Sequence, residues 1–94
     1  MMELVSDYNI ERPEIYIRNM KSRWGSCNDQ KKRIGLNVQL IKADRECIDQ
    51  VILHELVHFV HYDHSNKFYA LLGGLMPDWR ERKERLETKY NDGI

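Results

Sequence analysis

All four histidines of this 94-residue chain lie in one stretch, HELVHFVHYDH, which runs from His54 to His64. His54 and His58 are four residues apart, so on an α-helix their side chains lie on the same face. Two imidazoles at that spacing can bind one metal ion, with zinc–nitrogen distances of roughly 2.0–2.1 Å. Glu55 points about 100° away around the helix, which places its carboxylate beside a metal-bound water and outside the ligand set. The pattern HExxH is typical of a metal-activated water with a glutamate base.

A third ligand is expected from the residues that follow this motif. His61 lies on the same helical face as His54, but it is seven residues away, roughly 10.5 Å along the helix axis. Both side chains therefore cannot reach one ion. Residues 62–65 are typical of a turn, and a chain that bends back there returns His64 to the metal. We expect His54, His58 and His64 to bind the metal, with a fourth position left to water as in catalytic zinc sites.

A rival source of the third ligand is the last predicted helix, because some zinc sites use two histidines and a downstream glutamate. Glu81 and Glu84 are the candidates of that kind. Three further residues, Arg23, Tyr62 and His61, are candidates for stabilising an oxyanion or for hydrogen-bonding to the metal ligands.

Hydrophobic periodicity predicts the strands that accompany this helix. Apolar residues alternate with polar ones over Glu14–Met20 and over Arg33–Ile41. The segment between them contains Gly25 and Asn28 and is typical of a turn with a polar tip. Together the two strands suggest an antiparallel hairpin. Residues 3–10 could begin a short helix.

Three helices are predicted after the strands. Asp44 is the expected N-cap of a helix over Arg45–Tyr62, whose apolar residues lie almost all round the axis, as in a buried helix. Ser65 is the expected cap of a second helix over residues 67–76. Asp78 is the expected cap of a third over residues 79–90, whose mixed charges indicate a solvated face. The order of strands and helices predicts an α+β domain.

Composition indicates a single small domain over residues 1–94. The fifteen Lys and Arg residues balance fifteen Asp and Glu residues, so no overall field attracts nucleic acid or an anionic membrane. The longest apolar run, Val51 to Leu53, is far too short to span a membrane. The amino terminus has no signal-peptide pattern, and Cys27 and Cys47 are expected to be thiols. We therefore expect a soluble, cytoplasmic protein with no membrane or nucleic-acid partner.

Four motifs occur in a fixed order between Ser22 and Trp79: SRWGSC, RIGLNVQLI, HELVHFVHYDHSNKFY and PDW. This combination resembles the YgjP-like family of predicted metal-dependent hydrolases, which are related to zincin metallopeptidases and more distantly to SprT-like domains. The resemblance implies a minimal zincin-like fold, with zinc ligands at His54, His58 and His64 and with Glu55 as the catalytic acid/base. Members are usually longer, with a β-rich region before the matched segment. The chain is therefore expected to be a short form or a C-terminal fragment of that architecture.

The expected function is a zinc-dependent hydrolase of the metallopeptidase type, with one Zn²⁺ per chain and a peptide or protein as substrate. Metal-activated water would attack an amide carbonyl, with Glu55 as general base and then general acid. Imidazole ligands also suit other divalent transition metals. If the second strand forms an exposed edge, Asn37 and its neighbours could bind an extended peptide by strand addition.

Two other functions stay open. The same site could hydrolyse a nucleotide phosphoanhydride, although the sequence shows no glycine-rich phosphate loop and no dense Arg/Lys pocket. A non-catalytic, zinc-stabilised interaction module would need a fourth protein ligand, such as Cys27, and would have no use for Glu55.

Overall fold

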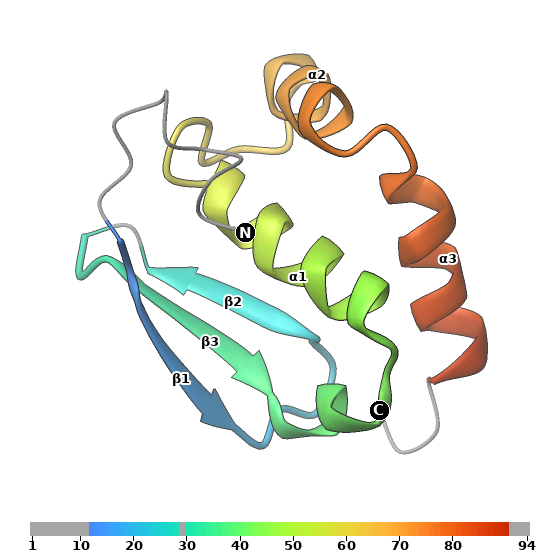
Figure 1. Ribbon diagram of the computed structural model, residues 1–94. Helices are drawn as coiled ribbons and strands as arrows, with labels where there is room; N and C mark the ends of the chain where they lie inside the picture. The colour runs from blue at the N-terminus through green and yellow to red at the C-terminus, as the bar shows by residue number, and fades with distance from the viewer. Residues whose placement is uncertain (1–11, 29, 91–94) are drawn as a thin grey trace.

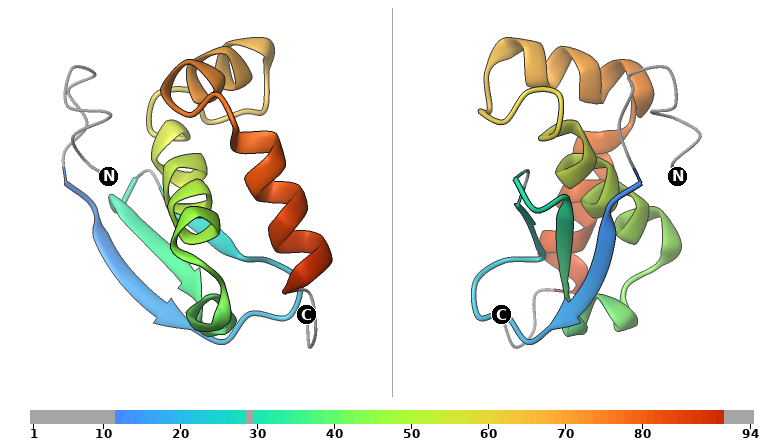
Figure 2. Two further views of the ribbon diagram at one scale, coloured as in Figure 1. Left: turned by 45° about the vertical axis from the view of Figure 1, so that its right-hand side comes forward. Right: turned by 90° about the vertical axis from the view of Figure 1, so that its left-hand side faces the viewer.

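The structure is a computed structural model that describes residues 12–28 and 30–90. Its elements follow in the order β1 (Glu14–Arg18), β2 (Gly25–Asn28), β3 (Arg33–Asn37), the 3-10 helix η2 (Val38–Lys42), α1 (Arg45–Val57), α2 (Asn66–Leu75) and α3 (Trp79–Lys89). The three α-helices lie on one side of the sheet (Figures 1 and 2). The predicted α+β class is therefore confirmed. The helix suggested for residues 3–10 lies outside the described residues.

The sheet is mixed, with the strand order β1-β3-β2. β2 and β3 form an antiparallel hairpin in which Gly25 lies opposite Leu36. β1 runs parallel to β3, with Ile15 opposite Ile34. The predicted antiparallel pairing of residues 14–20 with residues 33–41 is therefore wrong, and part of the predicted turn is itself a strand. An alternating pattern shows which face of a strand is buried, but it carries no information about the partner strand or its direction.

Asn37 ends β3, so the predicted strand over residues 33–41 stops four residues early. Its Oδ1 accepts a hydrogen bond from the backbone N–H of Gln39 at 3.0 Å, which starts η2. Its Nδ2 donates to the carbonyl oxygens of Met20 and Arg23, at 3.0 and 2.7 Å. The side chain is buried, and β3 is the central strand. The suggested strand addition at Asn37 is therefore wrong, because every edge of its strand is already paired.

α1 lies between the sheet and α3, and it supplies more of the buried hydrophobic core than any other element. Its N-cap is Asp44, as predicted, whose Oδ1 accepts from the backbone N–H of Cys47 at 2.9 Å. The largest fully buried side chains come from all layers of the fold: Phe68, Ile34, Leu53, Leu56, Leu72 and Leu86. α1 ends at Val57, five residues before the predicted end. The residues after it form tight turns, in which the N–H groups of Phe59 and Val60 bond to carbonyls three residues back.

α2 and α3 begin next to their predicted caps, but neither cap side chain makes a capping hydrogen bond. Asp78 instead accepts from Arg82 at 3.0 Å. Arg85 on α3 reaches back to the start of α1, where it donates to Glu46 at 2.9 Å and lies 3.4 Å from Asp44. α3 therefore braces the helix that carries the histidine motif. Within the described residues, no helix has both the length and the apolar character needed to cross a membrane.

Candidate metal centre

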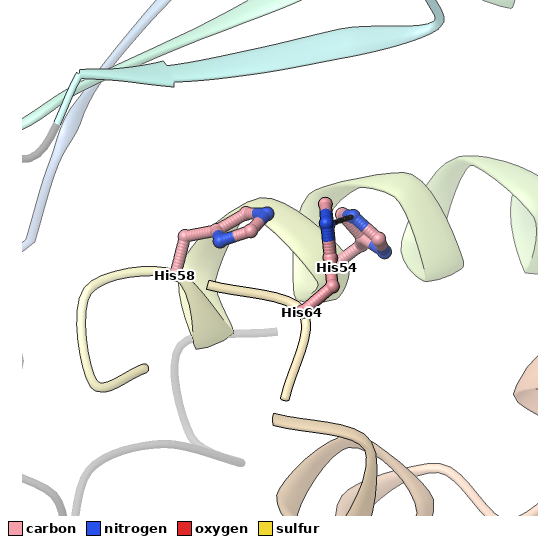
Figure 3. Close-up of side chains that lie close together, drawn as sticks. All are labelled: His54, His58 and His64. Carbon is pink, nitrogen blue, oxygen red and sulfur yellow. Dashed lines mark hydrogen bonds between the residues drawn. The ribbon is translucent and has the colours of Figure 1, made fainter. Parts of the chain in front are cut away.

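Three of the four histidines converge at the carboxyl-terminal end of α1 (Figure 3). One ring nitrogen from each of His54, His58 and His64 can be chosen so that all three lie within 4.8 Å of one another. The Nε2 atoms of His54 and His64 are 3.2 Å apart. Two nitrogens bound tetrahedrally to one zinc ion lie about 3.3 Å apart, given bond lengths of about 2.0–2.1 Å. The donor set therefore fits a single transition-metal ion, and these are the three histidines that the sequence selects.

The early end of α1 is what brings His64 back to the other two rings. His58 is the C-cap of α1, and the turns that follow reverse the chain before α2 begins. The Nδ1 of His58 lies 2.8 Å from the backbone carbonyl oxygen of Tyr62. A carbonyl can only accept a hydrogen bond, so Nδ1 carries the proton and Nε2 keeps the lone pair that a metal needs. The reversal of the chain therefore also orients the second ligand.

Phe68, on the first turn of α2, forms the floor beneath the three imidazoles. Its ring centroid lies 4.9, 4.6 and 4.9 Å from those of His54, His58 and His64. The side chain is fully buried, so it limits how far the rings can turn. Sequence reasoning assigned this residue no role. The only signal was its place four residues after His64 in the motif that carries the family resemblance.

Burial keeps the first two imidazoles neutral. Burial, with smaller contributions from the nearby His58 and His64, lowers the pKa of His54 to about 4. Burial likewise lowers the pKa of His58, with a smaller effect from His64. Neutral imidazole is the form that binds a metal, so near pH 7 these rings need no proton loss before binding.

Glu55 follows His54 on α1, and its carboxyl group is turned towards β2. The residue is 8% exposed, and burial raises the pKa of its carboxyl group to about 7, against a smaller lowering by Arg23. A Cβ atom on Gly25 would lie 2.9 Å from Cγ1 of Val51 and 3.3 Å from Oε2 of Glu55. The absence of a side chain at Gly25 therefore lets β2 approach this carboxylate closely. A carboxyl group with a pKa near neutrality is suited to accept and return a proton.

The rings and the carboxylate open into a cavity of about 450 Å³. Its lining residues are Arg23, Ser26, Cys27, His54, Glu55, His58, Tyr62 and His64. Arg23 and Tyr62, two of the predicted auxiliary residues, thus lie at the site. His61, the third, does not line this cavity; it lines a neighbouring hollow, which shares Tyr62 with the metal cavity.

The rival ligands stay outside the histidine cluster. Among the residues that the structure describes, the only close group of potential ligands is the three histidines. Glu81 accepts a hydrogen bond from Arg85 at 3.1 Å on α3, and Glu84 is not part of the group. Cys27 lines the cavity without joining the cluster. The described part of the chain therefore offers three protein ligands and leaves a position open, unlike a closed structural zinc site.

Gly25→Ala is expected to destabilise the fold by about 1–3 kcal/mol, because the added methyl group overpacks the contact between β2 and α1. The same shift displaces Glu55, so hydrolytic activity should fall as well. Urea denaturation measures the change in the free energy of unfolding. Gly74→Ala is the matched control, because a Cβ there meets nothing within 4 Å, and alanine favours a helix by about 1 kcal/mol. Equal stability of Gly25→Ala and the wild type would contradict this account of the contact.

Comparisons with known proteins agree with this geometry. Residues 1–89 match a family described as YgjP-like, metallopeptidase domain. The fold is similar to the crystal structure of the metallopeptidase zymogen abylysin from Pyrococcus abyssi, with a TM-score of 0.83 and 20% sequence identity. That match covers 99% of this chain and 93% of that chain. The fold is also similar to the crystal structure of the metallopeptidase zymogen jannalysin from Methanocaldococcus jannaschii, with 29% identity, coverage of 94% and 90%, and a TM-score of 0.76. No curated protein matches the sequence. The expected zincin-like fold is confirmed by these likenesses.

Proposed function

The chain belongs to the YgjP-like metallopeptidase family, and we propose that it cleaves peptide bonds with one zinc ion held by His54, His58 and His64. The observation that carries this proposal is the convergence of three imidazole nitrogens within 4.8 Å beside a buried carboxyl group, in an open cavity. Membership of the family already accounts for the metal and for a peptide as the substrate. The identity of the metal and the roles of the individual residues are the proposed part.

Zinc, when bound, would polarise the scissile carbonyl group and lower the pKa of water towards neutrality. Glu55 then accepts a proton from the attacking water as the water oxygen bonds to the carbonyl carbon. It returns that proton to the amide nitrogen as the C–N bond breaks. The raised pKa of Glu55 makes both transfers feasible near pH 7, since neither protonation state is strongly favoured.

The surrounding residues hold these groups in position. The hydrogen bond between His58 and the Tyr62 carbonyl keeps one nitrogen directed at the metal position, and Phe68 supports all three rings. Arg23 and Tyr62 line the cavity, so either can donate a hydrogen bond to the oxyanion that forms on the carbonyl oxygen.

An extended peptide would bind along β2, in place of the suggested site at Asn37. β2 is an edge strand of the sheet, and its residues Ser26 and Cys27 line the metal cavity. An added strand there makes main-chain hydrogen bonds that do not depend on the peptide's sequence. It would also carry the scissile bond past the three histidines.

The test is hydrolysis of a library of quenched fluorescent peptides by the purified, zinc-loaded chain. We expect cleavage that stops on addition of a metal chelator and returns when zinc is restored. Because both similar structures are zymogens, the assay is repeated after limited trypsin treatment that is stopped by a trypsin inhibitor. Release of phosphate from nucleoside triphosphates is measured in parallel. Phosphate release without peptide cleavage in either form would overturn the proposal.

A further inference from the structure

A second cavity adjoins the metal cavity, at the loop that joins β1 to β2. Its volume is about 380 Å³, and its lining residues are Arg18, Asn19, Met20, Lys21, Ser22, Arg23 and Ser26. Arg23 and Ser26 line both cavities. The two cavities therefore share part of their walls, so a peptide bound in the metal cavity lies next to the second one.

This second cavity is strongly basic. Three of its lining residues, Arg18, Lys21 and Arg23, carry positive charges, and no aspartate or glutamate occurs from Ile15 to Asn28. Within residues 12–28 and 30–90, no ion pair joins any of the three to a carboxylate. The sequence-based expectation that the chain has no dense Arg/Lys pocket is therefore wrong, although its total charge is balanced.

The walls of the basic cavity are held by the buried side chain of Asn37. The loop passes across the end of β3 (Figure 1), where Nδ2 of Asn37 bonds to the carbonyls of Met20 and Arg23. The backbone N–H of Asn37 also bonds to the Trp24 carbonyl at 2.9 Å. Asn37 is 1% exposed, so water does not compete for these bonds. Lys21 and Arg23 thus extend from a loop held by these bonds, and Arg18 extends from the end of β1, which reduces the entropy lost when a ligand binds.

We propose that the basic cavity binds a carboxylate of the peptide substrate, so that the site favours acidic peptides. The inference rests on the proposed function, because it assigns the anion to a peptide that also occupies the metal cavity. Guanidinium groups bind carboxylates through paired, charge-assisted hydrogen bonds, and the lysine adds a third cation. The carboxylate comes either from an aspartate or glutamate side chain or from the carboxyl terminus of the peptide.

Binding is measured without turnover, on the zinc-loaded Glu55→Gln protein. The probes are fluorescein-labelled, alanine-rich octapeptides that each contain one glutamate, placed at a different position in each peptide. The matched control for each is the same peptide with glutamine in place of glutamate. Fluorescence anisotropy measures the affinity of both. Each pair is made with a free and with an amidated carboxyl terminus. We expect about tenfold tighter binding of one glutamate peptide, or of the free carboxyl termini, which corresponds to about 1.4 kcal/mol. Added salt should reduce the difference.

The preference should disappear in Arg18→Gln and in Lys21→Gln, whose side chains are exposed and can be changed without disturbing the core. Lys31→Gln is the matched control, because Lys31 is an exposed residue of the turn between β2 and β3 and does not line this cavity. Equal binding of every acidic peptide and its neutral partner would overturn the inference. So would an acidic preference that survives both substitutions. Displacement of the peptides by ATP at lower concentration than by glutamate peptides would show that the cavity takes phosphates instead.

Failure of the proposed function is distinguishable from these outcomes. If the wild type cleaves no peptide but the glutamate preference depends on Arg18 and Lys21, the binding site stands and the catalytic proposal fails. If peptides are cleaved without any acidic preference, the catalytic proposal stands and the carboxylate-binding site fails.

Discussion

Glu55→Gln is expected to lower kcat for peptide cleavage by at least about a hundredfold, which is the low end of what general acid–base catalysis contributes. Glutamine has nearly the same shape, but it cannot accept a proton from water or return one to the leaving amine. The metal should remain bound, because the carboxyl group is not one of the three converging ligands. Steady-state kinetics and elemental analysis of the same preparation measure both quantities.

The fold should also survive this substitution. Glu55 is almost completely buried, and burial opposes its ionised form, so a neutral amide of the same size does not introduce a new desolvation cost. Urea denaturation of the variant is the control. Full retention of peptidase activity would mean that Glu55 takes no part in proton transfer. Loss of zinc together with activity would mean that its carboxylate binds the metal, and the ligand set would have to be redrawn.

His64→Ala is expected to weaken zinc binding by more than about a hundredfold, since loss of a hydrogen-bonding partner of a ligand alone costs about 10–100-fold. Its Nε2 lies 3.2 Å from that of His54, and its removal leaves two imidazoles from adjacent turns of one helix. Elemental analysis of protein purified without added metal is the measurement. We expect about one zinc per chain in the wild type, as in other three-ligand catalytic sites, and almost none in the variant.

Two substitutions serve as controls for this experiment. His61→Ala should keep its zinc, because His61 is not one of the three converging histidines. Glu84→Gln should also keep it, because Glu84 lies outside the cluster of potential ligands. Loss of zinc in either control, with zinc retained in His64→Ala, would show that the third ligand has been misassigned. Absence of zinc from the wild type, even after zinc is supplied, would contradict the metal centre itself.

The sequence by itself determined the features that depend on near neighbours in the chain. Two histidines four residues apart share a helical face wherever that helix lies. The cap at Asp44 is equally local, since its partner is the N–H of Cys47 three residues ahead. The shared face of His54 and His58 and the cap at Asp44 needed only helical geometry. The exclusion of His61 assumed the rise of a continuous helix, whereas α1 ends at Val57, so the turns after α1 decide where His61 lies. The place of His64 needed one more assumption, that the chain reverses after the motif.

Only the tertiary structure decided which distant segments meet. The direction of β1, the pairing of β2 with β3 and the burial of Asn37 all depend on partners that a period of two residues does not specify. The floor beneath the histidines is supplied by α2 through Phe68. The basic cavity arises because Asn37 fixes a loop that lies fourteen to seventeen residues earlier in the chain. Helical contacts are short in sequence and can be read from spacing, whereas these contacts join segments whose separation in the chain says nothing about their distance in space.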